Sequence, residues 1–392
     1  RMISRRDFLK YSVAVPALAS TGVQLLPFPV HASAGNWDRT LILLELKGGN
    51  DGLNTVVPFA DKTYYDMRPT IAIPRDKVLK HSEKLGFHPA FSPLMPLWEA
   101  KQMAVILGVG YRNPNLSHFR GIDIWNSASD ADQYLENGWI TQLFRESKPN
   151  AEFAADGINL GHNSVGPLEG DKTKVVTLNK NPEKFLKQAG RIKPGNSQTG
   201  NSALSHILKQ RRDLKSAADK MIAKQIRTVK LGLAFSDSKI GAQFETAARL
   251  LVAGVKTPVL KLTIKKFDTH AGQEPLHTEL LTEIATSIST FAKVMKAKGL
   301  WDKVTVMSYS EFGRRPFENN SSGSDHGTAA PHFMFGGKVK GGFYGEQPPL
   351  DDLDGVNLKY RVHFREIYAS VAREWWGLNA GFIKEKPLGL FL

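Results

Sequence analysis

Three apolar runs in this chain are each followed closely by residues of the types that bind metal ions. The runs and the residues after them are 41–46 with Asp51, 258–267 with Asp268 and His270, and 303–309 with Glu311. Short apolar runs bounded by turn residues are typical of buried strands. In a mostly parallel sheet, side chains that follow the carboxyl ends of strands meet at one edge. The pattern therefore predicts a sheet edge that can bind metal.

Segments with helical spacing alternate with these runs. Residues 274–298 carry apolar positions close to the 3.6-residue period, and shorter helices are expected at 91–101, 243–252 and 366–376. Further strands are expected at 102–109, 175–178 and 332–335. Strands alternating with helices predict one α/β domain with a mostly parallel sheet over residues 35–392. Within it, residues about 180–255 are expected to form a basic, helical insertion. Between Glu311 and the Asp-His-Gly that begins at Asp325, the chain is expected to form a mobile, glycine-containing loop.

The first residues predict export. Arg5 and Arg6 form a twin-arginine pattern, and a mildly apolar stretch follows it, interrupted by Pro16 and Pro27. We expect residues 1–34 to be a signal that directs the chain to the twin-arginine export machinery, and hence to the periplasm or outside the cell. The alternatives are an ordinary secretion signal or an uncleaved anchor. No later run is long enough to predict a membrane span in the mature form.

Composition limits the possible chemistry. The chain has no cysteine, which excludes disulfides, thiolate metal ligands and a cysteine nucleophile. The formal net charge is +14, which favours an anionic small molecule or an anionic polymer as substrate or partner. A solvated basic face without a partner is the other interpretation. Nucleic acid is not expected, because the basic residues are not interleaved with aromatic ones.

Several segments resemble a large family of twin-arginine-exported bacterial proteins of unknown function, related to the alkaline phosphatase and sulfatase-like hydrolases. Besides the signal they are LKGGNDGLNTVVP, NLSHFRGIDIW, FDTHAGQ, the stretch 304–346 and FREIYASVAREWWG. The resemblance implies an alkaline phosphatase-like α/β fold, in which a large, mostly parallel mixed sheet lies between helices. It also implies a metal-dependent hydrolase of phosphate esters, or less readily of sulfate esters, with one or two divalent metals among Zn, Mn, Mg and Ca.

The resemblance also implies roles for individual residues. Asp51 resembles an aspartate that binds one metal, and Ser117 resembles a nucleophile at a helix N-terminus. Asp268, His270 and His326 resemble the ligands of the other metal.

Two charged residues near the third strand complete the expected site. Glu311 stands where the family's strand-end aspartate is expected. Arg314 carries a planar guanidinium that suits a phosphate group, so we expect it to steady the substrate.

The chain departs from the superfamily pattern at Phe312, where a histidine ligand is usual. A second site without that imidazole would have mostly oxygen ligands, which suit Mg²⁺, Mn²⁺ or Ca²⁺. Asp325 or Asn50 could complete this site, or the second metal could be missing. His277 is the alternative to His270. The chain also lacks the Cys/Ser-x-Pro-x-Arg signature of sulfatases, so a formylglycine enzyme is not expected.

Each candidate also has a structural interpretation. Asp51 precedes a glycine and could be a turn residue, and Ser117 could be only a helix cap. Glu311 could pair with a neighbouring arginine. His118, His162 and His332 are expected to be ordinary packing or polar residues, although His118 lies beside the expected site. The alternative function is therefore a non-catalytic exported protein that binds an anionic polymer or a protein partner.

Overall fold

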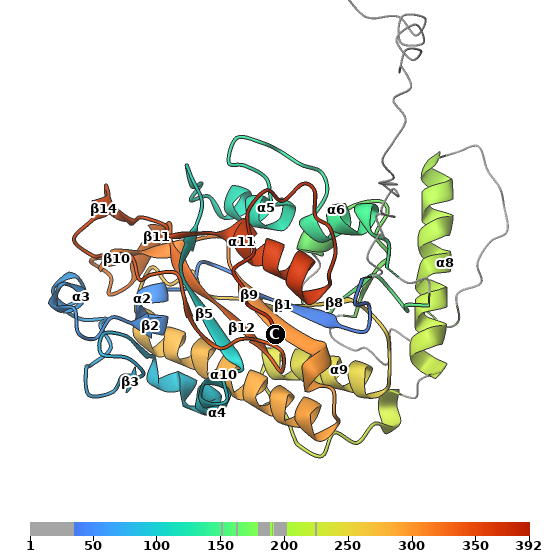
Figure 1. Cartoon of the computed structure of the whole chain (residues 1–392), viewed down its shortest axis with the longest axis horizontal. Coiled ribbons are helices and arrows are strands. Elements are labelled where there is room, and N and C mark those ends of the chain that lie inside the picture. The colour runs from blue at the N-terminus through green and yellow to red at the C-terminus, as the bar shows by residue number, and fades with distance from the viewer. Residues whose placement is uncertain are drawn as a thin grey trace, which may run out of the picture. The chain divides into compact units, whose positions relative to one another are not determined.

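The computed structural model describes residues 35–149, 152–161, 164–178, 189, 191, 202–223 and 226–392 (Figure 1). The predicted signal, His162 and part of the predicted insertion lie outside the described residues. Residues from Ser33 to Leu392 form one compact unit. No helix in the described part is long and apolar enough to cross a membrane.

A nine-stranded sheet organises this unit, in the order β13-β5-β12-β9-β1-β8-β6-β7, with β16 also paired to β5. The strands are β1 (Thr40–Leu46), β5 (Met103–Gly110), β6 (Gly157–Asn159), β7 (Val175–Thr177), β8 (Val259–Ile264), β9 (Val304–Tyr309), β12 (Ala330–Gly336), β13 (Gly342–Tyr344) and β16 (Val362–His363). Only β12 is antiparallel to its neighbours in this sheet, β5 and β9. The sheet is therefore mixed but mostly parallel, which confirms the predicted fold class.

Helices cover both faces of the sheet (Figure 1). Helices α9 (Lys239–Val252) and α10 (Gln273–Ala297) pack on one face, and α10 buries the apolar positions that its period predicted. Helices α5 (His118–Ser127), α6 (Trp139–Glu146) and α11 (Phe364–Ala369) pack on the other face. A π-helical turn, Ser370–Trp375, continues α11. The apolar stripe of each helix thus meets a sheet that is apolar on both sides.

The described part of the predicted insertion contains α8 (Ser202–Ala223), a short 3₁₀ turn (Ile226–Thr228) and α9. Ala217, Ala218 and Met221 of α8 join the same apolar cluster as α9 and α10. Helix α9 contacts both β8 and α10. Both helices therefore contribute to the covering of one sheet face.

The segment expected to be a mobile loop is instead a β-hairpin. Strand β10 (Gly313–Glu318) pairs antiparallel with β11 (Ser324–Gly327), so that Arg314 lies opposite His326. At Gly327 a Cβ would lie only 2.4 Å from the carbonyl carbon of Arg314, which explains the glycine at this close approach. The loop prediction was wrong because the buried guanidinium of Arg314 ties the two strands to the sheet edge.

Short elements complete the described chain. They are α2 (Gly52–Thr55), α3 (Lys62–Met67), α4 (Met95–Glu99), β2 (Val56–Val57), β3 (Leu79–Lys80), β4 (Gly86–Phe87), β14 (Leu353–Asp354), β15 (Asn357–Leu358) and 3₁₀ turns at Pro89–Leu94, Gly166–Leu168 and Trp301–Lys303. The expected helix at 91–101 is thus divided between a 3₁₀ turn and α4.

A buried ion pair lies on the sheet between β1 and β8. The Lys261 Nζ atom is 2.6 Å from Glu45 Oε2, and Thr263 donates a further hydrogen bond of 3.0 Å to the same oxygen. The side chains are only 1% and 6% exposed. Burial opposes the charge on Glu45, but Lys261 outweighs it and lowers the pKa of this carboxyl. Such a pair stabilises the fold only while both partners are present.

We predict that Lys261→Met lowers the free energy of unfolding by about 3–5 kcal/mol, because it leaves the Glu45 carboxylate buried and unpaired. Urea unfolding at pH 7 measures the change. The double variant Glu45→Leu/Lys261→Met should recover most of the loss, since it removes both charges. A single variant as stable as the wild type would contradict the prediction.

A second buried polar group, His332 on β12, makes stability depend on pH. The residue is 2% exposed, and its ring lies 4.8 Å from that of Trp125. Burial disfavours the charged imidazole and lowers the pKa of His332 to about 3. The unfolded chain therefore binds a proton here below about pH 6.5, whereas the folded chain does not. The stability associated with this neutral histidine is complete above pH 6.5 and falls as the pH falls towards 3.

We predict that a His332→Phe variant loses less stability on acidification than the wild type. One proton bound only by the unfolded chain changes the free energy of unfolding by about 1.4 kcal/mol per pH unit. Between pH 6.5 and 5, the free energy of unfolding of the wild type should therefore fall by about 2 kcal/mol more than that of His332→Phe. Parallel pH dependences in chemical denaturation would show that His332 titrates normally.

Candidate metal centre

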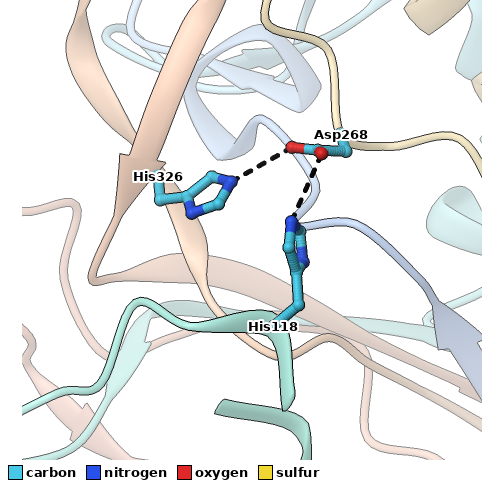
Figure 2. Close-up of side chains that lie close together, drawn as sticks. All are labelled: His118, Asp268 and His326. Carbon is cyan, nitrogen blue, oxygen red and sulfur yellow. Dashed lines mark hydrogen bonds and ion pairs between the residues drawn. The ribbon is translucent and has the colours of Figure 1, made fainter. Parts of the chain in front are cut away.

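Three histidines surround the carboxylate of Asp268 at the sheet edge. His118 Nε2 is 3.3 Å from Asp268 Oδ2, and His326 Nε2 is 3.1 Å from Asp268 Oδ1 (Figure 2). His270 Nε2 lies 3.0 Å from the same Oδ1. Potential ligand atoms of His118, Asp268 and His326 all lie within 4.8 Å of one another. Residues that are far apart in the sequence thus bring three imidazoles to one carboxylate.

The residues of the candidate site come from three different elements. His118 is the first residue of α5, and Asp268 follows β8 after a short turn. His326 lies in β11 of the hairpin. The sheet edge, a helix start and the hairpin therefore meet here, as strand-end geometry predicts for part of the set.

The second ring nitrogen of each histidine faces an acceptor. His118 Nδ1 lies 2.9 Å from Glu311 Oε1, and His270 Nδ1 lies 3.1 Å from Asp325 Oδ1. His326 Nδ1 lies 2.9 Å from the Leu116 carbonyl oxygen. Carboxylate and carbonyl oxygens only accept, so each Nδ1 donates and each Nε2 is left to face the cluster. Metal-binding histidines are commonly held by outer acceptors in this way.

The inward-facing atoms require positive charge among them. His270 Nε2 and His326 Nε2 are 3.0 Å apart, and two lone pairs at this distance repel unless a proton or a cation lies between them. In a tetrahedral zinc site with bonds of about 2.0–2.1 Å, neighbouring donors are about 3.3 Å apart. The three Nε2 atoms lie 3.0–3.3 Å from the Asp268 carboxylate, His118 facing Oδ2 and His270 and His326 facing Oδ1. Of these residues, His118, Asp268 and His326 form a group whose atoms are close enough together to hold one metal ion.

The charge state of the cluster is consistent with this fit. Partial burial would raise the pKa of Asp268, but the bonds from Arg314 and His326 outweigh it and lower the pKa to about 2. The carboxylate is thus ionised at neutral pH. The hydrogen bond to Glu311 raises the pKa of His118, so this ring readily carries positive charge when no metal is present.

Arg314 holds Asp268 in place. Its Nη2 atom donates to Asp268 Oδ1 at 2.8 Å and also to the backbone carbonyls of Gly48 and Phe267. Its other nitrogens donate to the carbonyls of Gly49 and Ser324 at 2.8 Å. The side chain is 0% exposed, so the guanidinium faces protein groups rather than the solvent side where a substrate would lie.

Asp51 lies in a different set of contacts. It caps α2 through the backbone N–H groups of Leu53 and Asn54, and its Oδ2 atom is 2.6 Å from Arg68 Nη1. Gln273 donates to the same oxygen. Arg68 outweighs the effect of burial and lowers the pKa of Asp51. Both oxygens are therefore engaged by protein donors, and no described contact joins Asp51 to the histidines.

Ser117 directly precedes His118 in the chain. It is exposed and is the N-cap of α5, yet its side chain makes no capping hydrogen bond. Its backbone N–H donates to Asn115 Oδ1 at 2.9 Å. Glu311, by contrast, is buried, and its Oε1 atom accepts from the Gly48 N–H at 2.9 Å as well as from His118.

Phe312 forms an apolar wall behind the histidines. Its ring lies 4.9 Å from the ring of His118 and 4.4 Å from that of His326. The predicted alternative ligand, His277, is buried and bonded to Asn50 Oδ1 at 2.9 Å, away from this wall. Burial lowers the pKa of His277 to about 4, which keeps it neutral.

The sequence interpretation missed His118, which it expected to be an ordinary residue. The available signal was its position directly after Ser117, at the start of a helix that follows a strand of the same sheet. The Asp268, His270 and His326 side chains do come together as the strand-end argument expected.

The chain belongs to the family described as protein of unknown function (DUF1501), which matches residues 38–376. Residues 2–22 match the signal sequence of the twin-arginine translocation pathway. The protein is therefore addressed to the twin-arginine export machinery and is periplasmic or secreted, as predicted. No curated protein matches the chain.

Matches between this chain and solved structures are distant. The zinc complex of the periplasmic domain of EcEptC from Escherichia coli has a TM-score of 0.35 at 9% identity, over 78% of this chain and 74% of that one. The lipoteichoic acid synthase LtaP from Listeria monocytogenes has a TM-score of 0.37 at 10% identity, over 91% and 75%. A protein in the alkaline phosphatase superfamily from Vibrio parahaemolyticus has a TM-score of 0.33 at 12% identity, over 79% and 62%. Likeness at this level assigns no activity and no residue role to this chain.

We predict that Glu311→Ala weakens zinc binding by about 10–100-fold, because it removes the outer acceptor of His118. Glu311→Gln keeps an acceptor oxygen and should retain most of the affinity. Competition with a zinc-responsive chelator measures the change.

The control is Asp51→Asn, checked for folding by circular dichroism because it disturbs the contact with Arg68. Its zinc affinity should match that of the wild type. A large loss of affinity in Asp51→Asn, with none in Glu311→Ala, would show that the sequence-based ligand Asp51 belongs to the metal site after all.

Proposed function

We propose that this member of a family of unknown function is an exported, metal-dependent hydrolase of phosphate esters that works with a single metal ion. The observation that supports the proposal most is the convergence of three outward-braced imidazoles on the Asp268 carboxylate. An exposed serine at the start of a helix lies directly beside this cluster. Metal ligands, a hydroxyl and a helix N-terminus are the parts that phosphate ester hydrolysis requires.

The proposed metal ligands are His118, Asp268, His270 and His326. Three nitrogen donors and one carboxylate favour zinc or a similar transition metal over magnesium or calcium. A divalent metal bound there supplies Lewis acidity, which withdraws electron density from an ester oxygen. The role of Arg314 in this proposal is to position Asp268, and the roles of Glu311 and Asp325 are to orient imidazoles.

Ser117 is the proposed nucleophile. Its Oγ atom forms a bond to phosphorus as the bond from phosphorus to the leaving oxygen breaks, and the serine proton passes through solvent to that oxygen. Water then cleaves the Oγ–P bond, which releases phosphate and restores the hydroxyl. The N-terminus of the ten-residue helix α5 favours the anionic group throughout, because its free N–H groups and dipole point towards it.

Phosphate is preferred to sulfate because the chain lacks cysteine and the sulfatase signature, whereas a plain serine suffices for phosphate. The second candidate is a non-catalytic exported protein that keeps the metal and binds an anionic partner. The buried Phe312 beside the histidines favours this reading, since it replaces a usual ligand. The experiment below separates the two.

We predict that the mature wild-type protein holds about one zinc per chain and hydrolyses p-nitrophenyl phosphate or bis(p-nitrophenyl) phosphate. Asp268→Asn should lose both metal and turnover, because it removes the central ligand. Ser117→Ala should keep the metal but lower kcat by at least about 10³-fold, as expected for a nucleophile. Elemental analysis and steady-state kinetics measure these quantities.

Ser238→Ala is the matched control, because Ser238 is the N-cap of α9 and does make a capping hydrogen bond, to Gly241. That variant should lose about 1 kcal/mol of stability and no activity, whereas Ser117→Ala should keep full stability. Bound metal without turnover on either ester would leave the non-catalytic candidate. Absence of metal after incubation with Zn²⁺ and Mn²⁺ would contradict both.

A further inference from the structure

A polar cleft of about 580 Å³ lies between the loops that precede and follow α5. Its walls come from the loop after β5, the loop after α5 and the segment around β16 and α11. Small-molecule sites commonly have volumes of about 300–1,000 Å³. The cleft is therefore large enough for a ligand of one or two rings.

The charges of the cleft are largely compensated within its own walls. Arg365 Nη2 is 2.6 Å from Asp130 Oδ1, and Arg365 Nε is 3.0 Å from Glu385 Oε1. Arg112 and Asp132 also line the cleft, and no described ion pair joins either of them to another residue. The Oε2 atom of Glu385 is buried and has no hydrogen-bond partner among the described residues. An unpaired buried carboxylate oxygen is costly unless a donor reaches it.

These groups indicate the chemical class of the ligand. The walls hold charged and hydrogen-bonding groups, so an apolar ligand would leave them unpaired. Three carboxylates disfavour an anion, and the arginines disfavour a simple cation. A polyhydroxylated ligand both donates and accepts, so its hydroxyls can bond to Asp132 and to Arg112. The Tyr360 ring, 38% exposed, offers a flat surface for the C–H face of a sugar.

A short chain segment links the cleft to the proposed nucleophile. The Tyr111 hydroxyl, in the cleft wall, accepts the Asn115 N–H at 3.2 Å, and Asn115 Oδ1 accepts the Ser117 N–H at 2.9 Å. Asn113 also lines the cleft and precedes Ser117 by four residues, which span at most about 14 Å. Ser117 and the cleft wall are therefore at most about 14 Å apart, measured along the chain from Asn113.

We propose that this cleft binds a sugar, and that the sugar is the alcohol part of the phosphate ester hydrolysed at Ser117. The second half of this statement rests on the proposed function, whereas sugar binding itself does not. The ester would place its phosphate at the helix N-terminus and its hydroxyls against Asp132, Arg112 and Tyr360. Substrate specificity would then come from the cleft rather than from the metal centre.

Saturation-transfer NMR on the mature protein tests the binding, with glucose, galactose, mannose and N-acetylglucosamine as separate probes. At least one sugar should receive saturation, and Tyr360→Ala and Asp132→Ala should each weaken its binding by about tenfold or more. The control is Phe317→Ala, because Phe317 has a matched exposure of 39% and lies outside the cleft. No binding of any of the four sugars, binding of ethanolamine instead, or equal effects of the Tyr360 and Phe317 variants would overturn the proposal.

Kinetics test the link to the nucleophile. Tyr360→Ala should raise KM by about tenfold for the phosphate ester of the sugar that binds, whereas Phe317→Ala should leave this KM unchanged. Turnover of the sugar phosphate with no effect of Tyr360→Ala would overturn the proposal while the hydrolase function stands. Tyr360-dependent sugar binding with no turnover of any ester would overturn the proposed function and the link, and would leave a sugar-binding site.

Discussion

The buried guanidinium of Arg314 is the interaction on which the sheet edge depends. It donates to the carbonyls of Gly48 and Gly49 after β1, of Phe267 after β8 and of Ser324 in the hairpin, and also to the Asp268 carboxylate. A fully buried cation is tolerated only when such acceptors surround it, so the chain segments must meet in one arrangement. That arrangement fixes Asp268, and the histidines are arranged around Asp268. The candidate metal centre is thus built on a structural charge that is itself buried.

The sequence predicted those features that depend on a local pattern of residues, such as strands, the long helix and the polar residues that follow strand ends. Apolar runs of strand length identified β1, β8 and β9, and the parallel topology then required the residues after β8 to lie near the other strand ends. The strand-end argument predicted that Asp268 and His270 lie together, the resemblance of its motif added His326, and the three side chains do lie together. The 3.6-residue period predicted α10 almost to its ends, because one face of that helix is buried along its whole length.

The sequence could not predict partners that come from distant segments. Asp51 has the position of a ligand, but Arg68, seventeen residues later, and Gln273 on α10 occupy its oxygens. No local sequence pattern predicts the contact of Asp51 with Arg68 or with Gln273. Arg314 looked like a substrate-binding residue for the same reason, since its acceptors are backbone carbonyls that no sequence motif marks. His118 was undervalued because a histidine at a helix start is usually unremarkable without knowledge of what lies across the sheet edge.

The contacts of Asp51 and Phe312 support a single metal in the proposed function by the same physical argument. A second metal near Asp51 would need the carboxylate oxygens that Arg68 and Gln273 now bind, and it would bring a double positive charge close to a guanidinium that is 0% exposed. In a buried environment that repulsion is strong, because little solvent screens it. At position 312 the superfamily usually has a histidine, which could serve as a further ligand of a second metal. This chain has Phe312 there, and its ring packs against His118 and His326. Arg68 therefore supplies, as a fixed part of the protein, the positive charge that a second ion would otherwise bring to Asp51. In the proposed single-metal site, hydrogen bonds to Glu311, Asp325 and the Leu116 carbonyl already orient the three imidazoles. A second cation is not needed to orient them.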